Sequence, residues 1–121
     1  MNFDTLRKFC SRLPGATRDI KWGADECHCV GGKMFAVFLL MEGKGATLSF
    51  KCEPPRFLEL TDVPGIIPAP YLARAHWVQV EDARALTDTT ACELVTTSHA
   101  LVFAKLTQRE RAAITGAVTP K

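Results

Sequence analysis

The sequence has no long hydrophobic run and no segment of low complexity. Its longest apolar run, MFAVFLLM at residues 34–41, is far shorter than the ~20 apolar residues that a membrane-spanning helix needs. The first residues mix acidic and basic side chains with apolar ones, and they lack the apolar core and cleavage site of a secretory signal. We therefore expect a cytoplasmic protein that does not associate with membranes.

The chain also lacks a strong excess of charge of either sign. Its 15 basic and 13 acidic residues leave a formal net charge of +2, and its isoelectric point is near 8.3. A domain that binds nucleic acid through its overall charge usually has an isoelectric point above about 9. Nucleic-acid binding would therefore have to use a local basic surface.

Motifs for catalysis are missing as well. No nucleophile occupies a strained strand-to-helix turn, no glycine-rich phosphate loop follows a strand, and no paired carboxylates occur at a catalytic spacing. Arg74, His76 and Trp77 could form an anion pocket, but a single histidine in a strand is more often structural. We expect a protein with no catalytic activity and no cofactor.

Five cysteines are present, an odd number that suits reduced thiols in the cytoplasm. Cys27 and Cys29 flank His28 in an expected strand, where successive side chains point to opposite faces. Two cysteines that share one face point in parallel, which is wrong for a disulfide, and they lack the Cys-x-x-Cys spacing of a zinc site. We interpret both as core residues, with His28 solvated on the outer face. A redox or metal pair with Cys52 is the alternative.

The first half of the chain predicts a helix followed by an antiparallel meander. Asn2 can cap the helix, and Pro14-Gly15 ends it. Its apolar residues recur at helical spacing, at Phe3, Leu6, Cys10 and Leu13. Four strands are expected at residues 19–22, 26–30, 34–41 and 46–51. Glycine-containing hairpin turns at residues 31–32 and 42–45 separate the last three of them.

The second half predicts a short helix at residues 54–60, because proline suits the first helical turn. Residues 62–70 hold three prolines and a glycine, which excludes regular structure there. A fifth strand follows at residues 76–80. Asp88 caps a long apolar helix that covers the sheet, and Thr107 with Glu110 forms a capping box that starts a last helix ending near Gly116. The sequence therefore predicts a single α+β domain over residues 1–121, with two layers and a five-stranded sheet.

Several motifs carry a resemblance to a known family. They are LPGA at residues 13–16, GGKMFAV at 31–37, LSFKCEP at 48–54, PAPYLARAHWVQV at 68–80 and SHALVFAKL at 98–106. In this order they resemble the YjbR/MmcQ family of small bacterial cytoplasmic proteins, over nearly the whole chain. The resemblance implies an antiparallel sheet covered by helices on one face, similar in outline to frataxin-like and secretion-chaperone-like folds. It also implies a double-wing arrangement, by which such proteins are labelled DNA-binding.

Two hypotheses about function follow, both for a monomer without a bound metal. In the first, the two hairpin turns are wings that bring Lys33 and Lys44 to DNA phosphates. The outer sheet face would add further cations and an aromatic ring for stacking: Lys51, Arg74, His76 and Trp77, or Trp22. In the second, the open sheet face or an edge strand binds a protein or peptide as an adaptor.

Overall fold

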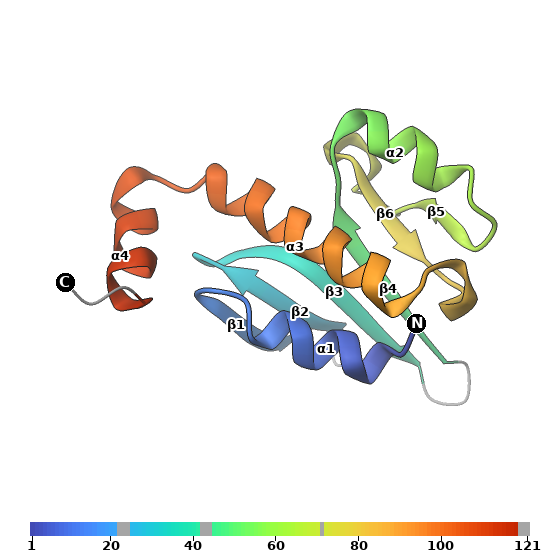
Figure 1. Ribbon diagram of the computed structural model, residues 1–121, viewed down its shortest axis with the longest axis horizontal. Coiled ribbons are helices and arrows are strands. Elements are labelled where there is room, and N and C mark those ends of the chain that lie inside the picture. The colour runs from blue at the N-terminus through green and yellow to red at the C-terminus, as the bar shows by residue number, and fades with distance from the viewer. Residues whose placement is uncertain (22–24, 42–44, 71, 119–121) are drawn as a thin grey trace.

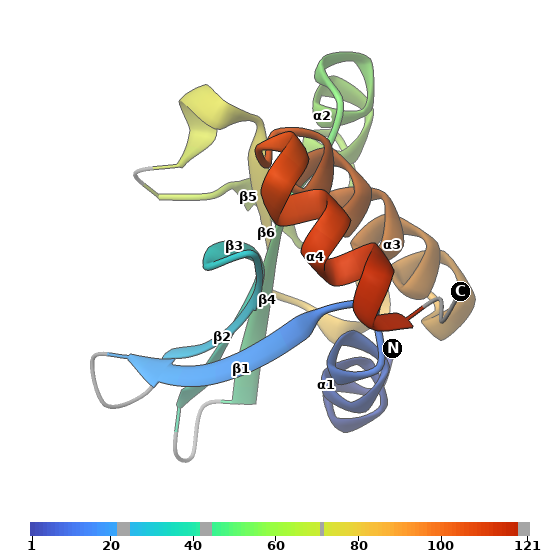
Figure 2. The same ribbon diagram turned by 90° about the vertical axis from the view of Figure 1, so that its left-hand side faces the viewer.

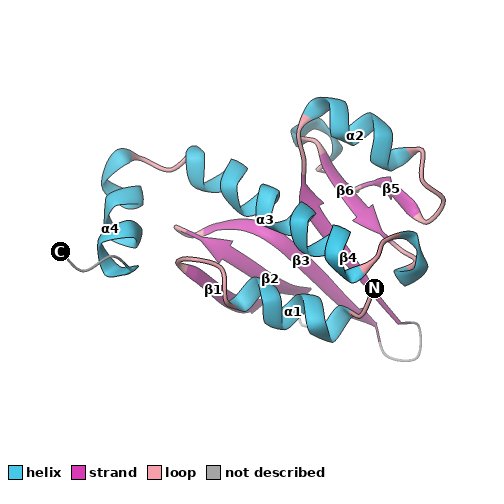
Figure 3. Ribbon diagram, in the orientation of Figure 1, coloured by secondary structure: helices cyan, strands magenta, loops and turns pink. Residues whose placement is uncertain are grey.

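The computed structural model of the protein describes residues 1–21, 25–41, 45–70 and 72–118. An antiparallel sheet forms one layer, and helices α1 (Phe3–Ser11) and α3 (Asp88–Ala104) lie along one of its faces as the second layer (Figure 1, Figure 3). Helix α2 (Pro54–Thr61) packs near one edge of the sheet, and helix α4 (Gln108–Val118) follows α3 at the carboxyl-terminal end. The predicted α+β class with helices on the sheet is confirmed.

The sheet has six strands, one more than the sequence predicted. They are β1 (Ala16–Lys21), β2 (Asp25–Val30), β3 (Lys33–Met41), β4 (Gly45–Lys51), β5 (Ile66–Pro68) and β6 (Trp77–Val80), in the spatial order β1-β2-β3-β4-β6-β5. The first four strands form the predicted meander, although β1 begins three residues earlier than predicted. Strand β6 returns to pair with β4, and it begins at Trp77 because His76 has left-handed backbone angles.

The additional strand, β5, lies within the segment that the prolines had excluded from regular structure. That prediction is wrong, since Ile66 pairs with Val80 and Pro68 with Val78. A proline fits there because β5 is an edge strand, and a residue without an N–H removes no hydrogen bond on the unpaired side. The strand has only three residues, so local sequence signals were too short to reveal it.

The helix caps follow the prediction at two of three sites. The Asn2 side chain accepts a hydrogen bond from the Thr5 N–H at 3.0 Å. Thr107 and Glu110 form the capping box, because each side chain accepts from the other's backbone N–H, at 3.1 and 2.9 Å. Asp88 is not the cap of α3. Thr87 takes that position, while the Asp88 carboxylate accepts from the Asn2 N–H at 2.6 Å and connects the two helix starts.

The core lies between the sheet and helices α1 and α3. Its members are buried apolar residues from every layer: Leu6, Cys10, Val30, Phe35, Phe38, Leu48, Phe50, Val78, Val80, Ala91, Val95 and Val102 are among them. A buried hydroxyl connects α3 to the sheet, since Ser98 Oγ donates to the Phe35 carbonyl at 2.6 Å and accepts from the Lys51 N–H at 2.9 Å. Helix packing and polar contacts therefore position α3 over β3 and β4.

The two faces of strand β2 are reversed relative to the prediction. His28 is fully buried on the helix-covered face, where its ring meets Phe35 and Phe38 edge-on. Cys27 and Cys29 are buried, as predicted, but they lie on the other face of the sheet and not under the helices. The prediction that His28 is solvated is wrong, because its side of β2 faces α1 and the core.

None of the helices in the described part of the chain is long and apolar enough to cross a membrane.

Candidate functional site

The two predicted wing lysines flank the same strand in the sequence. Lys33 begins β3, directly after the Gly31-Gly32 turn. Lys44 lies outside the described residues, as does Trp22. Strand β3 has nine residues, which separates its ends by roughly 27 Å. The pairing of Lys33 and Lys44 as two wings stays a prediction.

Three of the predicted cations lie at one end of the sheet. The β3–β4 register places Lys51 at the same end as Lys33. The Lys51 ammonium donates to the Ala75 carbonyl at 2.5 Å, next to the exposed Arg74. Partial burial lowers the pKa of Lys51, and the nearby positive charge of Lys105 lowers it further. This end of the molecule is therefore locally basic.

His76, a candidate nucleic-acid-binding residue, and Trp77, a predicted stacking residue, are both held in contacts within the fold. His76 has φ 62° and ψ 41°, its ring meets Phe57 edge-on with centroids 5.6 Å apart, and its carbonyl accepts from the Cys52 N–H at 2.9 Å. Trp77 is only 5% exposed and pairs with Lys51 in the sheet. Trp77 is therefore too buried to stack on a base, whereas His76 is half-buried and its part in nucleic-acid binding stays a prediction.

A groove that sequence reasoning missed crosses the open face of the sheet. Figure 2 shows α1 and α3 on one side of the strands, while the segment between β5 and β6 extends over the other side. The groove has a volume of about 440 Å³, within the usual range of roughly 300–1,000 Å³ for binding pockets. Its lining comes from four strands and from the segment at residues 69–72: Asp25, Met34, Val37, Leu39, Thr47, Ser49, Ala69, Pro70, Leu72 and Gln79.

The chemistry of this open-face groove is apolar and nearly uncharged. Met34, Val37, Leu39 and Leu72 provide apolar surface, and the hydroxyl and amide groups of the remaining lining are neutral. Among the described residues of the lining, Asp25 is the one that carries a charge. The described lining offers no cation, the kind of group that binds phosphate.

The sequence did contain a signal for the open-face groove. An antiparallel strand with one face in water normally alternates apolar and polar residues, whereas residues 34–41 of β3 are apolar throughout. Ala36 and Phe38 fill the helix-covered core, and Val37 and Leu39 line the groove. A continuous apolar run in an antiparallel meander indicates that both faces of the strand need cover.

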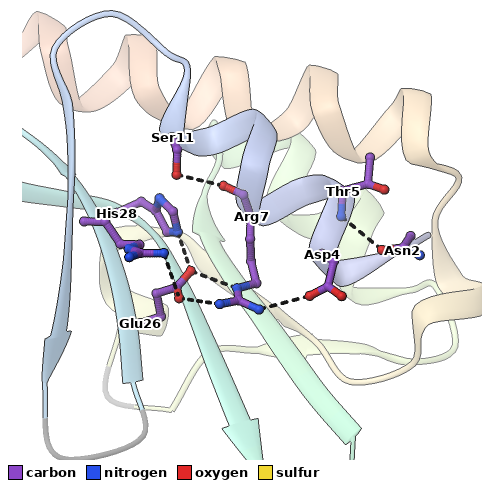
Figure 4. A network of polar contacts seen from close by, with 8 residues as sticks. Asn2, Asp4, Thr5, Arg7, Ser11, Glu26 and His28 are labelled. Carbon is purple, nitrogen blue, oxygen red and sulfur yellow. Dashed lines mark hydrogen bonds and ion pairs between the residues drawn. The ribbon is translucent and has the colours of Figure 1, made fainter.

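A second cluster, under helix α1, holds a buried carboxylate (Figure 4). Glu26 is 1% exposed, and the Arg7 guanidinium binds it through two bonds: Nε to Oε2 at 3.0 Å and Nη2 to Oε1 at 2.8 Å. The hydrogen bonds from Arg7 are the main cause that lowers the pKa of Glu26 to about 2. His28 Nε2 lies 2.9 Å from Glu26 Oε2 and donates to it, because the ionised carboxylate can only accept.

His28 is left with one unsatisfied atom in this arrangement. Its Nδ1 is buried and has no hydrogen-bond partner in the described part of the chain. Burial lowers the pKa of His28, and the attraction of Glu26 offsets this only in part. The neutral ring therefore contributes packing and one hydrogen bond, and it faces the core and not the open-face groove.

The cysteines form no disulfide among the described residues. Burial raises the pKa of Cys10 to about 12 and that of Cys52 to about 11, which keeps both thiols protonated. Cys52 Sγ donates to the His76 carbonyl at 3.4 Å, so its partner is not on β2. Within the described ranges, no group of three or more histidine, cysteine or acidic side chains is placed to hold a metal ion.

These features define a class of protein: an α+β domain whose helices cover one face of an open antiparallel sheet. The sequence profile of the YjbR family matches residues 11–101, and the chain belongs to this family. No match was found among curated proteins.

Two solved structures share the fold. A Deinococcus radiodurans protein with the domain DUF419 is 27% identical, with a TM-score of 0.82 over 94% of this chain and 88% of its own. A Pseudomonas syringae protein is 19% identical, with a TM-score of 0.69 over 84% of this chain and 99% of its own, and it supports the fold alone.

Proposed function

We propose that this YjbR-family chain is a binding module without catalytic activity, and that it recognises an apolar segment of another protein in the open-face groove. The observation that carries the proposal is the apolar lining of the groove by Met34, Val37, Leu39 and Leu72 on the sheet face opposite the helices. Apolar surface gathered on one face of a soluble domain is a common feature of interaction sites. Asp25, the one charged residue in the described part of the lining, favours a protein partner over a polyanion.

The buried pair of Glu26 and His28, whose pKa values are both lowered, supports a non-catalytic role. Glu26 and His28 lie under α1, on the face of the sheet opposite the groove. Arg7 neutralises the carboxylate through two hydrogen bonds. A catalytic acid or base has to reach its substrate, and these groups are enclosed by protein.

The experiment is selection from a displayed library of random peptides, followed by measurement of their affinities. Peptides chosen by the wild-type protein should lose at least tenfold in affinity for Thr47→Arg, because the new side chain occupies the half-exposed floor of the groove. The matched control is Thr96→Arg, the same substitution at an exposed site on α3. Equal binding to wild type and Thr47→Arg, with both folded by circular dichroism, would reject the groove as the site.

DNA binding is the second candidate, and the locally basic end of the sheet favours it. Lys33, Lys51 and Arg74 lie there, with Lys105 close to Lys51. Fluorescence anisotropy of labelled duplex DNA, at low and at physiological salt, tests this candidate. Lys33→Ala should weaken binding and reduce the salt slope by about one, and so should Lys44→Ala if both hairpin lysines contact phosphates. Binding that is unchanged in both variants argues against the wing arrangement.

A further inference from the structure

The occupant of the open-face groove can be specified further from the geometry of its floor, an argument that rests on the proposed function. The floor consists of β2, β3, β4 and β6, which are adjacent in the sheet. Their backbone N–H and C=O groups are used in the antiparallel pairings between neighbours. The floor of the groove therefore offers side chains to a partner, and it offers no free strand edge.

A floor without a free strand edge favours one backbone conformation of the partner over another. An extended peptide binds well where it can pair with a strand edge, because its own backbone groups need partners. Laid on the face of a sheet, an extended peptide would leave the N–H and C=O groups that point at the protein unpaired. An α-helix satisfies its backbone hydrogen bonds internally and presents only side chains. The sheet face thus favours a helical partner.

The size of the groove fits the same partner. The lining runs from Met34 to Leu39 along β3, about 17 Å at 3.3 Å per residue. Across the four strands it covers roughly 14 Å at 4.8 Å per spacing. Either direction holds about three turns of an α-helix.

The other face of the same sheet shows how helices are accommodated. Val95 of α3 and Leu6 of α1 pack on the core side of the strands. A sheet with apolar side chains on both faces is stable when both are covered, and a helix on the groove side would complete a three-layer arrangement. The run at residues 34–41 has the two-sided apolar character that such an arrangement requires.

The charge and polarity of the lining specify the partner further. Asp25 stands at the β2 end of the lining and places a carboxylate there, across from Lys21 of β1 in the strand register. A partner helix with a lysine or arginine at one end would place that cation near the carboxylate. Neutral groups from Thr47, Ser49 and Gln79 lie along the floor and suit a partner face that is apolar with small polar interruptions.

We propose that the open-face groove binds an amphipathic α-helix of a partner protein, with apolar residues at positions i, i+3, i+4 and i+7 and a basic residue near Asp25.

Two peptide libraries of equal composition test this proposal. One places the apolar residues at helical spacing, and the other places them at alternate positions, as in a strand. Each is selected on the wild-type protein, and the affinity of every selected binder for Thr47→Arg is then measured. We expect binders from the helical library only, and circular dichroism should show that they become helical on binding. A proline at the centre of such a peptide should lower its affinity at least tenfold, because proline breaks a helix.

Reversing the charge of the peptide or of Asp25 tests the proposed ion pair. Changing the terminal lysine of a selected peptide to glutamate should weaken binding to wild type two- to fivefold, the size expected for an exposed ion pair. Asp25→Lys should reverse this preference. If charge exchange has no effect on affinity, the basic residue is removed from the proposal.

The outcomes separate this inference from the proposed function. Binders from the strand library alone, or equally from both, would overturn the helical partner and leave protein binding in the groove intact. Binders from neither library, together with none from the random library, would overturn both. Helical binders that attach equally well to Thr47→Arg would place the helix elsewhere on the molecule and also reject the inference.

Discussion

Arg7 of α1 and Glu26 of β2 form a two-bond ion pair that attaches the first helix to the sheet. The guanidinium atoms lie 2.8 and 3.0 Å from the two carboxylate oxygens, and Glu26 is almost completely buried. The same carboxylate accepts from His28, and Arg18 lies 4.0 Å from it at the surface. One buried carboxylate therefore connects α1, β1 and β2.

Removing the cation from this pair should destabilise the protein. Arg7→Met leaves the Glu26 carboxylate buried with His28 and, at 4.0 Å, the exposed Arg18 as its partners, and breaking a buried ion pair on one side costs about 3 kcal/mol. Arg18→Met is the control, because Arg18 is 59% exposed and surface pairs contribute about 0–1 kcal/mol. Urea denaturation measures the free energy of unfolding of both variants, and equal losses of stability would contradict the special role of Arg7.

Stability should fall with acid below the ordinary pKa of histidine. Burial lowers the pKa of His28 in the folded protein, while the unfolded chain binds a proton near pH 6.5. Below that pH the unfolded state holds more protons than the folded state, so the free energy of unfolding decreases as the pH falls towards the lowered folded pKa.

The His28→Phe variant isolates this effect in urea denaturation between pH 7 and pH 5. It should have a flatter pH dependence than wild type in this window. Glu26 contributes to stability in a separate pH window. Its folded pKa is about 2, against an ordinary value of 4.5, so the stability that it contributes is lost only as the pH falls from about 4.5 towards 2. The same slope in wild type and His28→Phe would show that another group is responsible.

Ser98 should be essential for the attachment of α3 to the sheet. Ser98→Ala leaves the Phe35 carbonyl and the Lys51 N–H without their partner, which costs about 1–3 kcal/mol for buried groups. Thr97→Ala is the neighbouring control, because the Thr97 hydroxyl donates only to the Glu93 carbonyl of its own helix. Thermal unfolding should show a clear decrease for the first variant and little change for the second.

The two glycines of the β2–β3 turn should differ in their tolerance of alanine. Both have positive φ, 59° at Gly31 and 80° at Gly32, so each alanine variant should lose about 1–2 kcal/mol from backbone strain. At Gly31 the new Cβ would also lie 2.7 Å from the Leu106 side chain, whereas at Gly32 it would meet no atom within 4 Å. We therefore expect Gly31→Ala to be the less stable of the two by urea denaturation, and the reverse order would contradict the close packing of Leu106.

Local signals in the sequence predicted most of the fold. Helical spacing and the Asn2 cap located α1, glycine turns located the hairpins, and the Thr107–Glu110 pair located the start of α4. These signals act over a few residues, through backbone conformation and nearby hydrogen bonds. Strand β5 escaped them because a three-residue strand is stabilised by its partner β6 and not by its own composition.

The candidate site was harder to predict from the sequence than the fold. Lys33, the wing lysine that the structure describes, is an exposed charge beside a turn, and only the sheet topology shows that successive turns alternate between the two ends of the sheet. The open-face groove combines residues from β2, β3, β4, β6 and the segment at residues 69–72, which are far apart in the chain. Its one local indication was the uninterrupted apolar run of β3.

The sequence by itself determined where the chain is helical or extended, except at β5, and which neighbouring residues point to opposite faces. It placed Cys27 and His28 on different sides of β2, because side chains alternate along a strand. Only the tertiary structure decided which side α1 and α3 cover, and so which of the two residues is in the core. The physical reason is that alternation is a property of the local backbone, whereas the choice of face depends on long-range packing. The burial of Glu26 with Arg7 shows where that packing placed α1.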